Sequence, residues 1–173
     1  MKANVKGSLF LVGFMGAGKT TVGKLLAARL GRRFLDTDEI IEHQSGLTIE
    51  RIFKLGGEKQ FRRMESEIVE VVCQNGPAVI ALGGGAVCGE ENWMKIRQSG
   101  VTFYLRWNIN VLLSRILNDE HRPLTRGKKN GADLVALFES RRPRYEASDY
   151  IIDCPDSAVP EQIVEQILRK VGA

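Results

Sequence analysis

Hydrophobic and polar positions alternate along the chain in two patterns, one typical of buried strands and one typical of helices. Short apolar runs predict five β-strands, at residues 8–12, 33–36, 78–82, 101–105 and 149–153. Three of these runs are almost wholly apolar, as expected of strands that are covered on both faces of a sheet. Between the strands, apolar side chains recur at helical spacing, which predicts helices over residues 19–30 and 59–75 and a last one that begins at Pro160.

This alternation of strands and helices predicts an α/β fold, with a parallel five-stranded sheet flanked by helices. The chain has 173 residues, of which 43% are hydrophobic and 27% charged, so we expect a single domain over residues 1–173. One segment, at about residues 118–131, is polar, basic and rich in turn-forming residues. It is long for a connection inside a compact domain, so we interpret it as a lid, with a disordered loop as the alternative.

Composition and charge narrow the classes of function. The three cysteines have no CxxC spacing and the two histidines are isolated, which argues against a disulfide framework or a zinc site. No apolar run approaches the roughly 20 residues that span a bilayer, so we expect a cytoplasmic protein without a membrane partner. The formal net charge of +4 favours anionic ligands, but Lys and Arg are dispersed and only 7% of residues are aromatic. We therefore expect small phosphorylated or carboxylated ligands, no nucleic acid, and a monomer.

A glycine-rich motif follows the first predicted strand and opens the first predicted helix. Residues 13–20 read GFMGAGKT, which fits the P-loop pattern G-x-x-x-x-G-K-S/T in its proper context. Glycines allow backbone N–H groups to turn inward around phosphate oxygens, and the start of a helix favours negative charge. Lys19 would reach the β and γ phosphates, and the Thr20 hydroxyl would coordinate Mg²⁺. The predicted nucleotide contacts are Gly16, Ala17, Gly18, Lys19, Thr20 and Thr21. A turn that merely joins strand to helix is the alternative.

Two acidic residues follow the second predicted strand, in the sequence RFLDTDE. Asp36 ends that apolar strand and lies close in sequence to the P-loop, so we assign it to the Mg²⁺ site, mostly through water. Asp38, two residues further on, would then face the hydroxyl group that accepts the phosphate. The alternative is that Asp38 only caps the helix that begins there.

Six motifs occur in a characteristic order: GFMGAGKTT at 13–21, DTD at 36–38, FRRME at 61–65, GGG at 83–85, HRPL at 121–124 and RRPRY at 141–145. Their order and approximate spacing resemble those of shikimate kinases, over about residues 8–153. The resemblance implies a nucleoside-monophosphate-kinase-like fold. It also implies ATP-dependent phosphorylation of the 3-hydroxyl of shikimate, a step of aromatic amino-acid biosynthesis.

The resemblance also assigns roles to individual residues. It implies that Arg122 belongs to the lid and approaches the ATP phosphates, acting in catalysis with Lys19 and Asp38, and that Arg115 lies beside adenine. The implied contacts to shikimate are Asp38, Arg62, Gly84, Gly85 and Arg141. One departure is Arg144, which stands where the family usually has leucine.

The residues themselves support these roles but leave alternatives open. The planar fork of arginine suits a carboxylate, yet Arg62 could instead form a surface pair with Glu65 at i, i+3. Arg141 would share a helical face with apolar residues and needs a partner there, either a ligand carboxylate or a buried carboxylate of the protein. Three glycines allow close backbone approach to a ligand, but they also fit an ordinary turn. A solvated basic loop fits residues 121–129, HRPLTRGKK, as well as a lid does.

Three other functions share the P-loop. A gluconate kinase would have less use for two arginines on the acceptor side. A P-loop switch protein would carry a guanine-reading N-K-x-D run, and none occurs in the chain. An RNA-directed P-loop protein would bind with a steep dependence on salt.

Overall fold

The sheet of the protein has five parallel strands, as predicted. A computed structural model describes residues 6–118 and 131–172. In it the strands lie in the order β2-β3-β1-β4-β5. Their bounds are Ser8–Val12 for β1, Arg33–Asp36 for β2, Ala78–Ala81 for β3, Gly100–Arg106 for β4 and Tyr150–Asp153 for β5.

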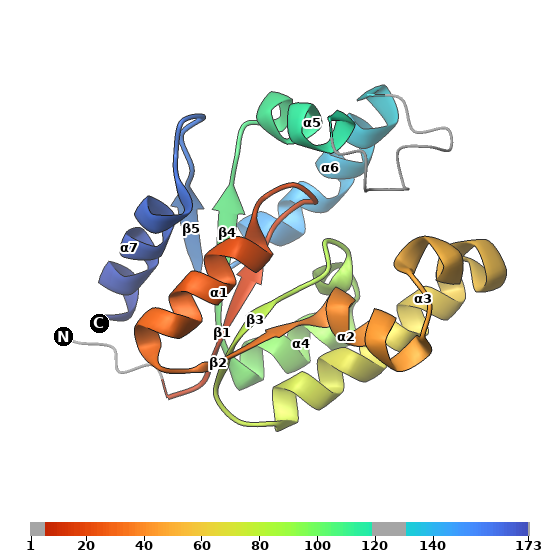
Figure 1. Ribbon diagram of the computed structural model, residues 1–173, viewed down its shortest axis with the longest axis horizontal. Helices are drawn as coiled ribbons and strands as arrows, with labels where there is room; N and C mark the ends of the chain where they lie inside the picture. The colour runs from red at the N-terminus through yellow and green to blue at the C-terminus, as the bar shows by residue number, and fades with distance from the viewer. Residues whose placement is uncertain (1–5, 119–130, 173) are drawn as a thin grey trace.

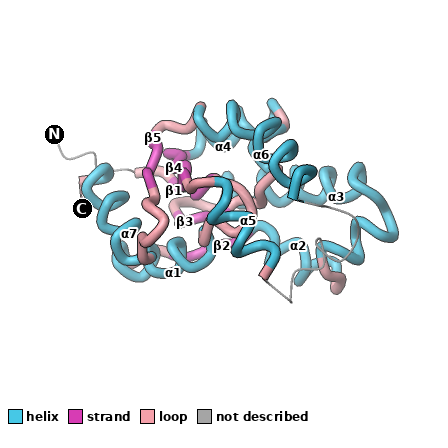
Figure 2. The backbone as a smooth tube through the Cα atoms, turned by 90° about the horizontal axis from the view of Figure 1, so that it is seen from above, coloured by secondary structure: helices cyan, strands magenta, loops and turns pink. Residues whose placement is uncertain are grey.

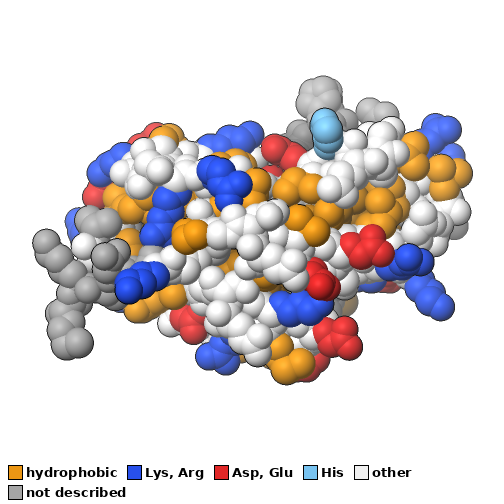
Figure 3. Space-filling view, turned by 90° about the horizontal axis from the view of Figure 1, so that it is seen from below, with side chains coloured by type: hydrophobic (Ala, Val, Ile, Leu, Met, Phe, Trp, Pro, Cys, Tyr) orange, Lys and Arg blue, Asp and Glu red, His pale blue; other side chains and the backbone are white. Residues whose placement is uncertain are grey.

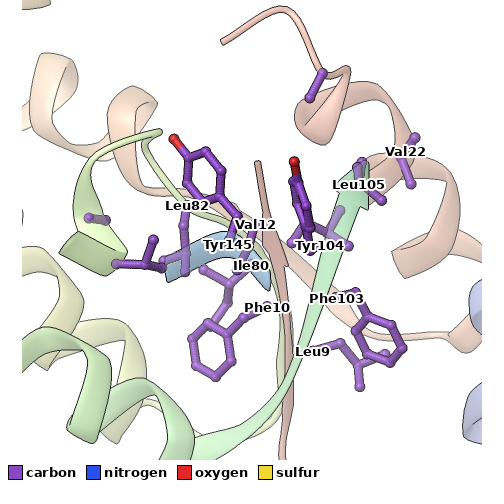
Figure 4. Packing of buried hydrophobic residues seen from close by; sticks show 14 of the residues in the cluster. Leu9, Phe10, Val12, Val22, Ile80, Leu82, Phe103, Tyr104, Leu105 and Tyr145 are labelled. Carbon is purple, nitrogen blue, oxygen red and sulfur yellow. The ribbon is translucent and has the colours of Figure 1, made fainter. Parts of the chain in front are cut away.

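The central strand explains why the apolar runs are continuous. β1 pairs with β3 on one side, with Leu9 opposite Val79, and with β4 on the other, with Leu9 opposite Val101. All five residues of β1 are buried. Leu9 and Phe10 point to opposite faces of the sheet (Figure 4), so both faces must be covered.

Helices cover both faces of the sheet. Figure 2 shows α1 (Lys19–Leu30) and α7 (Pro160–Val171) on one side of the strands, and α4 (Glu90–Ser99) and α6 (Gly131–Glu146) on the other. The remaining helices are α2 (Thr37–Ser45), α3 (Ile49–Gln74) and α5 (Ile109–Leu117). In α7 the apolar stripe is buried as its spacing predicts, with Ile163, Val164, Ile167, Leu168 and Val171.

Several predicted boundaries are wrong. The helix predicted from residue 59 belongs to α3, which begins at Ile49 and is interrupted at Gly57, with φ 69° and ψ −177°. β3 ends at Ala81, one residue early. Asp149 does not belong to β5, because its carboxylate accepts hydrogen bonds from the backbone and hydroxyl of Thr102 instead.

Most of the predicted lid, residues 119–130, lies outside the described residues. At its two ends, Asn118 is the C-cap of α5, and Gly131 is the first residue of α6. None of the described helices is long and apolar enough to cross a membrane. On the face of the molecule in Figure 3, basic and acidic side chains are interspersed with apolar and uncharged ones.

The parallel topology gathers the candidate site residues at one edge of the sheet. The arrowheads of β1, β4 and β5 point toward the end of the molecule where α5 and α6 lie (Figure 1). Gly13 follows β1, Asp36 ends β2, Gly83 comes two residues after β3, and Trp107 follows β4. In sheets of this kind, ligands bind at the carboxyl ends of the strands.

Candidate active site

The P-loop connects β1 to α1 through glycines in left-handed conformations. Gly16 and Gly18 have φ values of 79° and 78°, which other residues rarely adopt. Gly18 is the N-cap of α1, and the helix bonds begin with the Val22 N–H donating to its carbonyl at 2.9 Å. The first N–H groups of a helix lack partners within it, so this turn can receive an anion.

The Lys19 side chain folds back along the loop. Its Nζ donates to the carbonyls of Gly13 at 2.8 Å and Phe14 at 3.0 Å. These bonds hold the ammonium group beside the P-loop, where its charge also acts on Asp38. A cation held here can meet an anion that binds at the start of α1.

Asp36 has two roles in the structure. Its Oδ2 accepts the Thr20 hydroxyl at 2.7 Å, and its Oδ1 accepts the backbone N–H of Asp38 at 3.0 Å and of Glu39 at 3.4 Å. Asp36 is therefore the N-cap of α2, and the alternative that Asp38 serves only as this cap is wrong. The pairing of hydroxyl and carboxylate brings together the two residues predicted to face Mg²⁺.

Asp38 lies in the first turn of α2 with an enclosed carboxyl group. Its Oδ1 is buried and has no hydrogen-bond partner among the described residues. Its pKa is raised from 3.8 to about 6, mainly by burial and also by the charge of Asp36, whereas Lys19 opposes the shift. A carboxyl group with this pKa can both hold and release a proton near neutral pH.

Glu65 is a site residue that the sequence analysis considered only as a surface partner of Arg62. It is 1% exposed, and its Oε1 also lacks a partner among the described residues. Burial raises its pKa, and the charges of Arg62 and Arg141 act against that shift. The signal was present in the sequence: Glu65 falls on the apolar stripe of α3, four residues after Phe61 and three before Ile68.

The predicted Arg62–Glu65 pair forms, but it is not a surface pair. Arg62 Nη1 donates to Glu65 Oε2 at 2.6 Å, and Glu65 is buried. The other edge of the guanidinium faces Glu58, with Nη2 at 3.3 Å and Nε at 3.4 Å from Glu58 Oε1. Glu58 is mostly exposed, so a ligand can displace it from Arg62, whereas Glu65 fixes the direction of the guanidinium.

Two of the three glycines after β3, Gly83 and Gly85, lie in close contact with side chains of the site. None of the three has a positive φ. A methyl group at Gly83 would lie 2.5 Å from Asp38 Oδ1 and 3.0 Å from Glu65 Oε1, and one at Gly85 would collide with the guanidinium of Arg62. The segment also forms a turn, in which the Ala86 N–H donates to the Gly83 carbonyl at 3.0 Å. It is therefore both a turn and the place where the site side chains meet the backbone.

Arg141 reaches the same segment from α6. Its Nη1 would lie 3.5 Å from a methyl group at Gly84, and the Tyr145 hydroxyl donates to the Gly84 carbonyl at 2.5 Å. Burial raises the pKa of Tyr145 far above its usual range, so it stays a neutral donor. The other members of this face of α6, Leu134 and Phe138, are buried as predicted. Arg62, Arg141 and Asp38 thus surround the three glycines.

On the nucleotide side, Arg115 lies against the P-loop. Its Nη1 donates to the Gly16 carbonyl at 3.1 Å, and its guanidinium lies 3.9 Å from the centroid of the Trp107 ring. Trp107, which the sequence analysis did not single out, donates through Nε1 to the Ala17 carbonyl at 3.0 Å. Arg122, predicted to act in catalysis, lies outside the described residues.

Arg144, the departure from the family pattern, has defined partners on α4. Its Nη2 lies 2.5 Å from Glu90 Oε2, and its guanidinium is 5.3 Å from the centroid of the Trp93 ring. The residue thus links α6 to α4 while Arg141, one turn earlier, faces the glycines.

Comparisons with known proteins show the family of the chain. A family model described as shikimate kinase matches residues 15–172. A shikimate kinase of Thermodesulfovibrio yellowstonii is 39% identical over 163 residues, which are 94% of each chain. The structure of a shikimate kinase from Acinetobacter baumannii in complex with shikimate has a TM-score of 0.89 and 36% identity, covering 95% of this chain and 92% of that one.

A more distant structure shares the fold alone. A gluconokinase from Sinorhizobium meliloti has a TM-score of 0.64 at 20% identity, covering 96% of this chain and 91% of that one. The family match, by contrast, extends over most of the sequence and over the motifs that surround the site. The chain belongs to the shikimate kinase family.

Proposed function

We propose that this protein transfers the γ-phosphoryl group of ATP to the 3-hydroxyl of shikimate, giving ADP and shikimate 3-phosphate. One observation carries the proposal: Arg62 and Arg141 reach the glycines after β3 from two different helices, beside a buried carboxyl group of Asp38. The P-loop accounts for binding of the nucleotide, and two convergent guanidinium groups account for binding of an acceptor that carries a carboxylate. The relative from Acinetobacter baumannii supports the same acceptor, since its structure holds shikimate.

ATP binds along the P-loop in this proposal. Backbone N–H groups of Gly16, Ala17, Gly18, Thr20 and Thr21 surround the phosphates, and Lys19 moves from the loop carbonyls to the β and γ oxygens. Arg115 lies beside the base. By the resemblance to the family, Arg122 would act on the ATP phosphates.

The residues present also fit a Mg²⁺ ion. The Thr20 hydroxyl and the Asp36 carboxylate lie within 2.7 Å of each other beside the P-loop, and hard oxygen donors of this kind suit Mg²⁺. Thr20 would hold the ion directly, and Asp36 would hold it mostly through water. When bound, the ion neutralises charge on the phosphate oxygens.

The acceptor is held and activated by residues around the glycines. Arg62 and Arg141 bind the carboxylate of shikimate, and the backbone of Gly84 and Gly85 borders the ring. Asp38 orients the 3-hydroxyl, whose oxygen attacks the γ-phosphorus while the bond to the ADP oxygen breaks. The hydroxyl proton passes to Asp38, whose pKa of about 6 leaves it ionised at neutral pH. Lys19 and Arg122 stabilise charge on the transferring group.

An ADP-release assay with a panel of acceptors tests the proposal. Shikimate should give rapid ADP release, whereas gluconate, nucleoside monophosphates and buffer alone should give little. Equal ADP release without any acceptor would refute the kinase function. Faster ADP release with gluconate than with shikimate would show that shikimate is not the acceptor. Gel filtration with light scattering tests the proposed monomer. Titrations with RNA and with anionic vesicles test the expected lack of nucleic-acid and membrane partners.

A further inference from the structure

Two consecutive carbonyl groups of the P-loop are held from outside by Trp107, which precedes α5, and by Arg115, in the last turn of α5. Trp107 Nε1 donates to the Ala17 carbonyl at 3.0 Å, and Arg115 Nη1 donates to the Gly16 carbonyl at 3.1 Å. These bonds cross 90 and 99 positions of the sequence. They are independent of the bonds that Lys19 makes inside the loop.

The tryptophan and the arginine form one unit. The Arg115 guanidinium lies 3.9 Å from the centroid of the Trp107 ring, within the range of a cation–π contact. Trp107 is 5% exposed, whereas Arg115 is exposed. The buried ring is therefore a platform that fixes the plane of an exposed cation.

The platform itself is held in place by the backbone on both sides. Trp107 follows the last residue of β4, and its other neighbour, Asn108, is the N-cap of α5 and accepts the Asn110 N–H at 3.0 Å. The helix that begins there packs on the P-loop, since a methyl group at Gly16 would lie 3.3 Å from a side-chain carbon of Ile116. The indole therefore has little freedom to leave the Ala17 carbonyl.

We propose that Trp107 is a positioning residue of the nucleotide site, through the P-loop on one side and Arg115 on the other. In a planar trans peptide, the carbonyl and the following N–H point in opposite directions. The indole N–H holds the Ala17 carbonyl on the outside of the loop and so directs the Gly18 N–H toward the phosphates. Its ring also presents the guanidinium of Arg115 flat, which suits contact with a nucleobase. The inference rests on the proposed nucleotide site but not on the acceptor.

The test measures ADP binding by calorimetry in the presence of Mg²⁺ and without an acceptor. Trp107→Phe keeps an aromatic ring but removes the indole N–H, so the dissociation constant for ADP should rise about fivefold, as for one lost hydrogen bond. Trp107→Leu also removes the ring under Arg115 and should weaken binding further. The matched control is Trp93→Phe, the same change at the other buried tryptophan, which should bind ADP as the original protein does.

Fluorescence gives a readout that leaves Trp107 intact. The chain has two tryptophans, so the Trp93→Phe protein emits from Trp107 alone and the Trp107→Phe protein from Trp93 alone. Addition of ADP and Mg²⁺ should change the emission of the first protein and leave that of the second unchanged. The KM for shikimate should stay the same in both Trp107 variants.

Three outcomes would overturn the role of Trp107. These are unchanged ADP affinity in both Trp107 variants, unchanged emission of the Trp93→Phe protein on ADP binding, and a parallel loss of thermal stability, ADP affinity and shikimate affinity. The third outcome would identify Trp107 as a packing residue. A protein that binds ADP with this dependence on Trp107 but does not phosphorylate shikimate would refute the proposed function and leave this inference standing.

Discussion

The close contact between Gly85 and Arg62 makes the substitution Gly85→Ala informative. Gly85 has φ −104° and ψ −10°, so alanine can adopt its backbone conformation without strain. The three atoms nearest to the new methyl group would all belong to the guanidinium of Arg62, with which it would collide. A flexible side chain can move away, so the fold should be retained. The substitution should instead displace the guanidinium of Arg62, whose Nη1 lies 2.6 Å from Glu65 Oε2 in the original protein.

The size of the effect follows from the contact that is lost. A hydrogen bond to a charged group contributes about 1.5–3 kcal/mol. If Arg62 no longer meets the shikimate carboxylate, KM for shikimate should rise roughly 10- to 150-fold, since about 1.4 kcal/mol is tenfold. KM for ATP should stay within about twofold, because Arg62 contacts no P-loop residue in the structure. The protein should remain folded, because replacing glycine at a compatible position stabilises by about 0.4–1 kcal/mol through the unfolded chain, which offsets part of the cost of moving Arg62 away from the buried Glu65.

Initial rates of ADP release, with each substrate varied in turn, measure both constants. Gly89→Ala is the matched control, because a methyl group there would have its nearest neighbour at 3.9 Å and the backbone is extended, with φ −75°. It should behave as the original protein does. A Gly85→Ala enzyme with an unchanged KM for shikimate would refute the reasoning. Equal increases in KM for ATP and shikimate would also refute it, because the damage would then not be confined to Arg62.

Three further substitutions test the proposed roles. Lys19→Ala should nearly abolish turnover with little change in melting temperature, because the side chain is not part of the hydrophobic core and its amine donates to carbonyls of the P-loop itself; near-normal activity would refute the P-loop assignment. Asp38→Asn should lower kcat strongly while calorimetry still detects ATP binding; loss of ATP affinity alone would mean that Asp36 and Asp38 have exchanged roles. The same variant should be more stable than the original protein at pH 8, by up to about 3 kcal/mol, because a pKa raised from 3.8 to about 6 means that the folded state resists ionisation. Between these two pKa values the folded state binds more protons than the unfolded state, so the stability of the original protein should fall as pH rises from about 4 to 6. The difference in stability between Asp38→Asn and the original protein should vanish below about pH 4. Urea titrations at several pH values measure both free energies of unfolding. Arg141→Lys should raise KM for shikimate about ten- to a hundredfold and leave KM for ATP unchanged, because lysine lacks the planar fork; the methyl ester of shikimate should show a much smaller difference, and equal penalties for acid and ester would assign Arg141 to the fold.

Local patterns in the sequence were sufficient for the sheet and the P-loop. The strands of a parallel sheet that is covered on both faces are continuous apolar runs, and all five predicted runs became strands, with end residues shifted at three of them. The P-loop is a contiguous motif whose geometry depends on its own glycines, Gly16 and Gly18 among them. The helix predicted over residues 59–75 begins just after Gly57, where a left-handed glycine interrupts α3, and what the apolar spacing missed is the part of α3 before that glycine, from Ile49.

The acceptor side was only partly predictable. Arg62, Gly84, Gly85 and Arg141 were identified from their residue types and from resemblance, and the structure places them around one segment. Whether the Arg62–Glu65 pair lies on the surface could not be decided from the i, i+3 spacing, which is the same for a buried and an exposed pair. Burial of Glu65 decides it, and burial depends on which elements cover α3.

Tertiary structure alone decided which residues support the site from outside it. Trp107 is one of two tryptophans in the sequence and lies outside every motif, yet its indole reaches Ala17 across 90 positions. Arg144 meets Glu90 across 54 positions and lies over Trp93. Such contacts depend on the order β2-β3-β1-β4-β5, which brings the ends of distant strands together at one edge. A motif is local, so it identifies the groups that touch a ligand, whereas the groups that hold them in place are found only when the chain is folded.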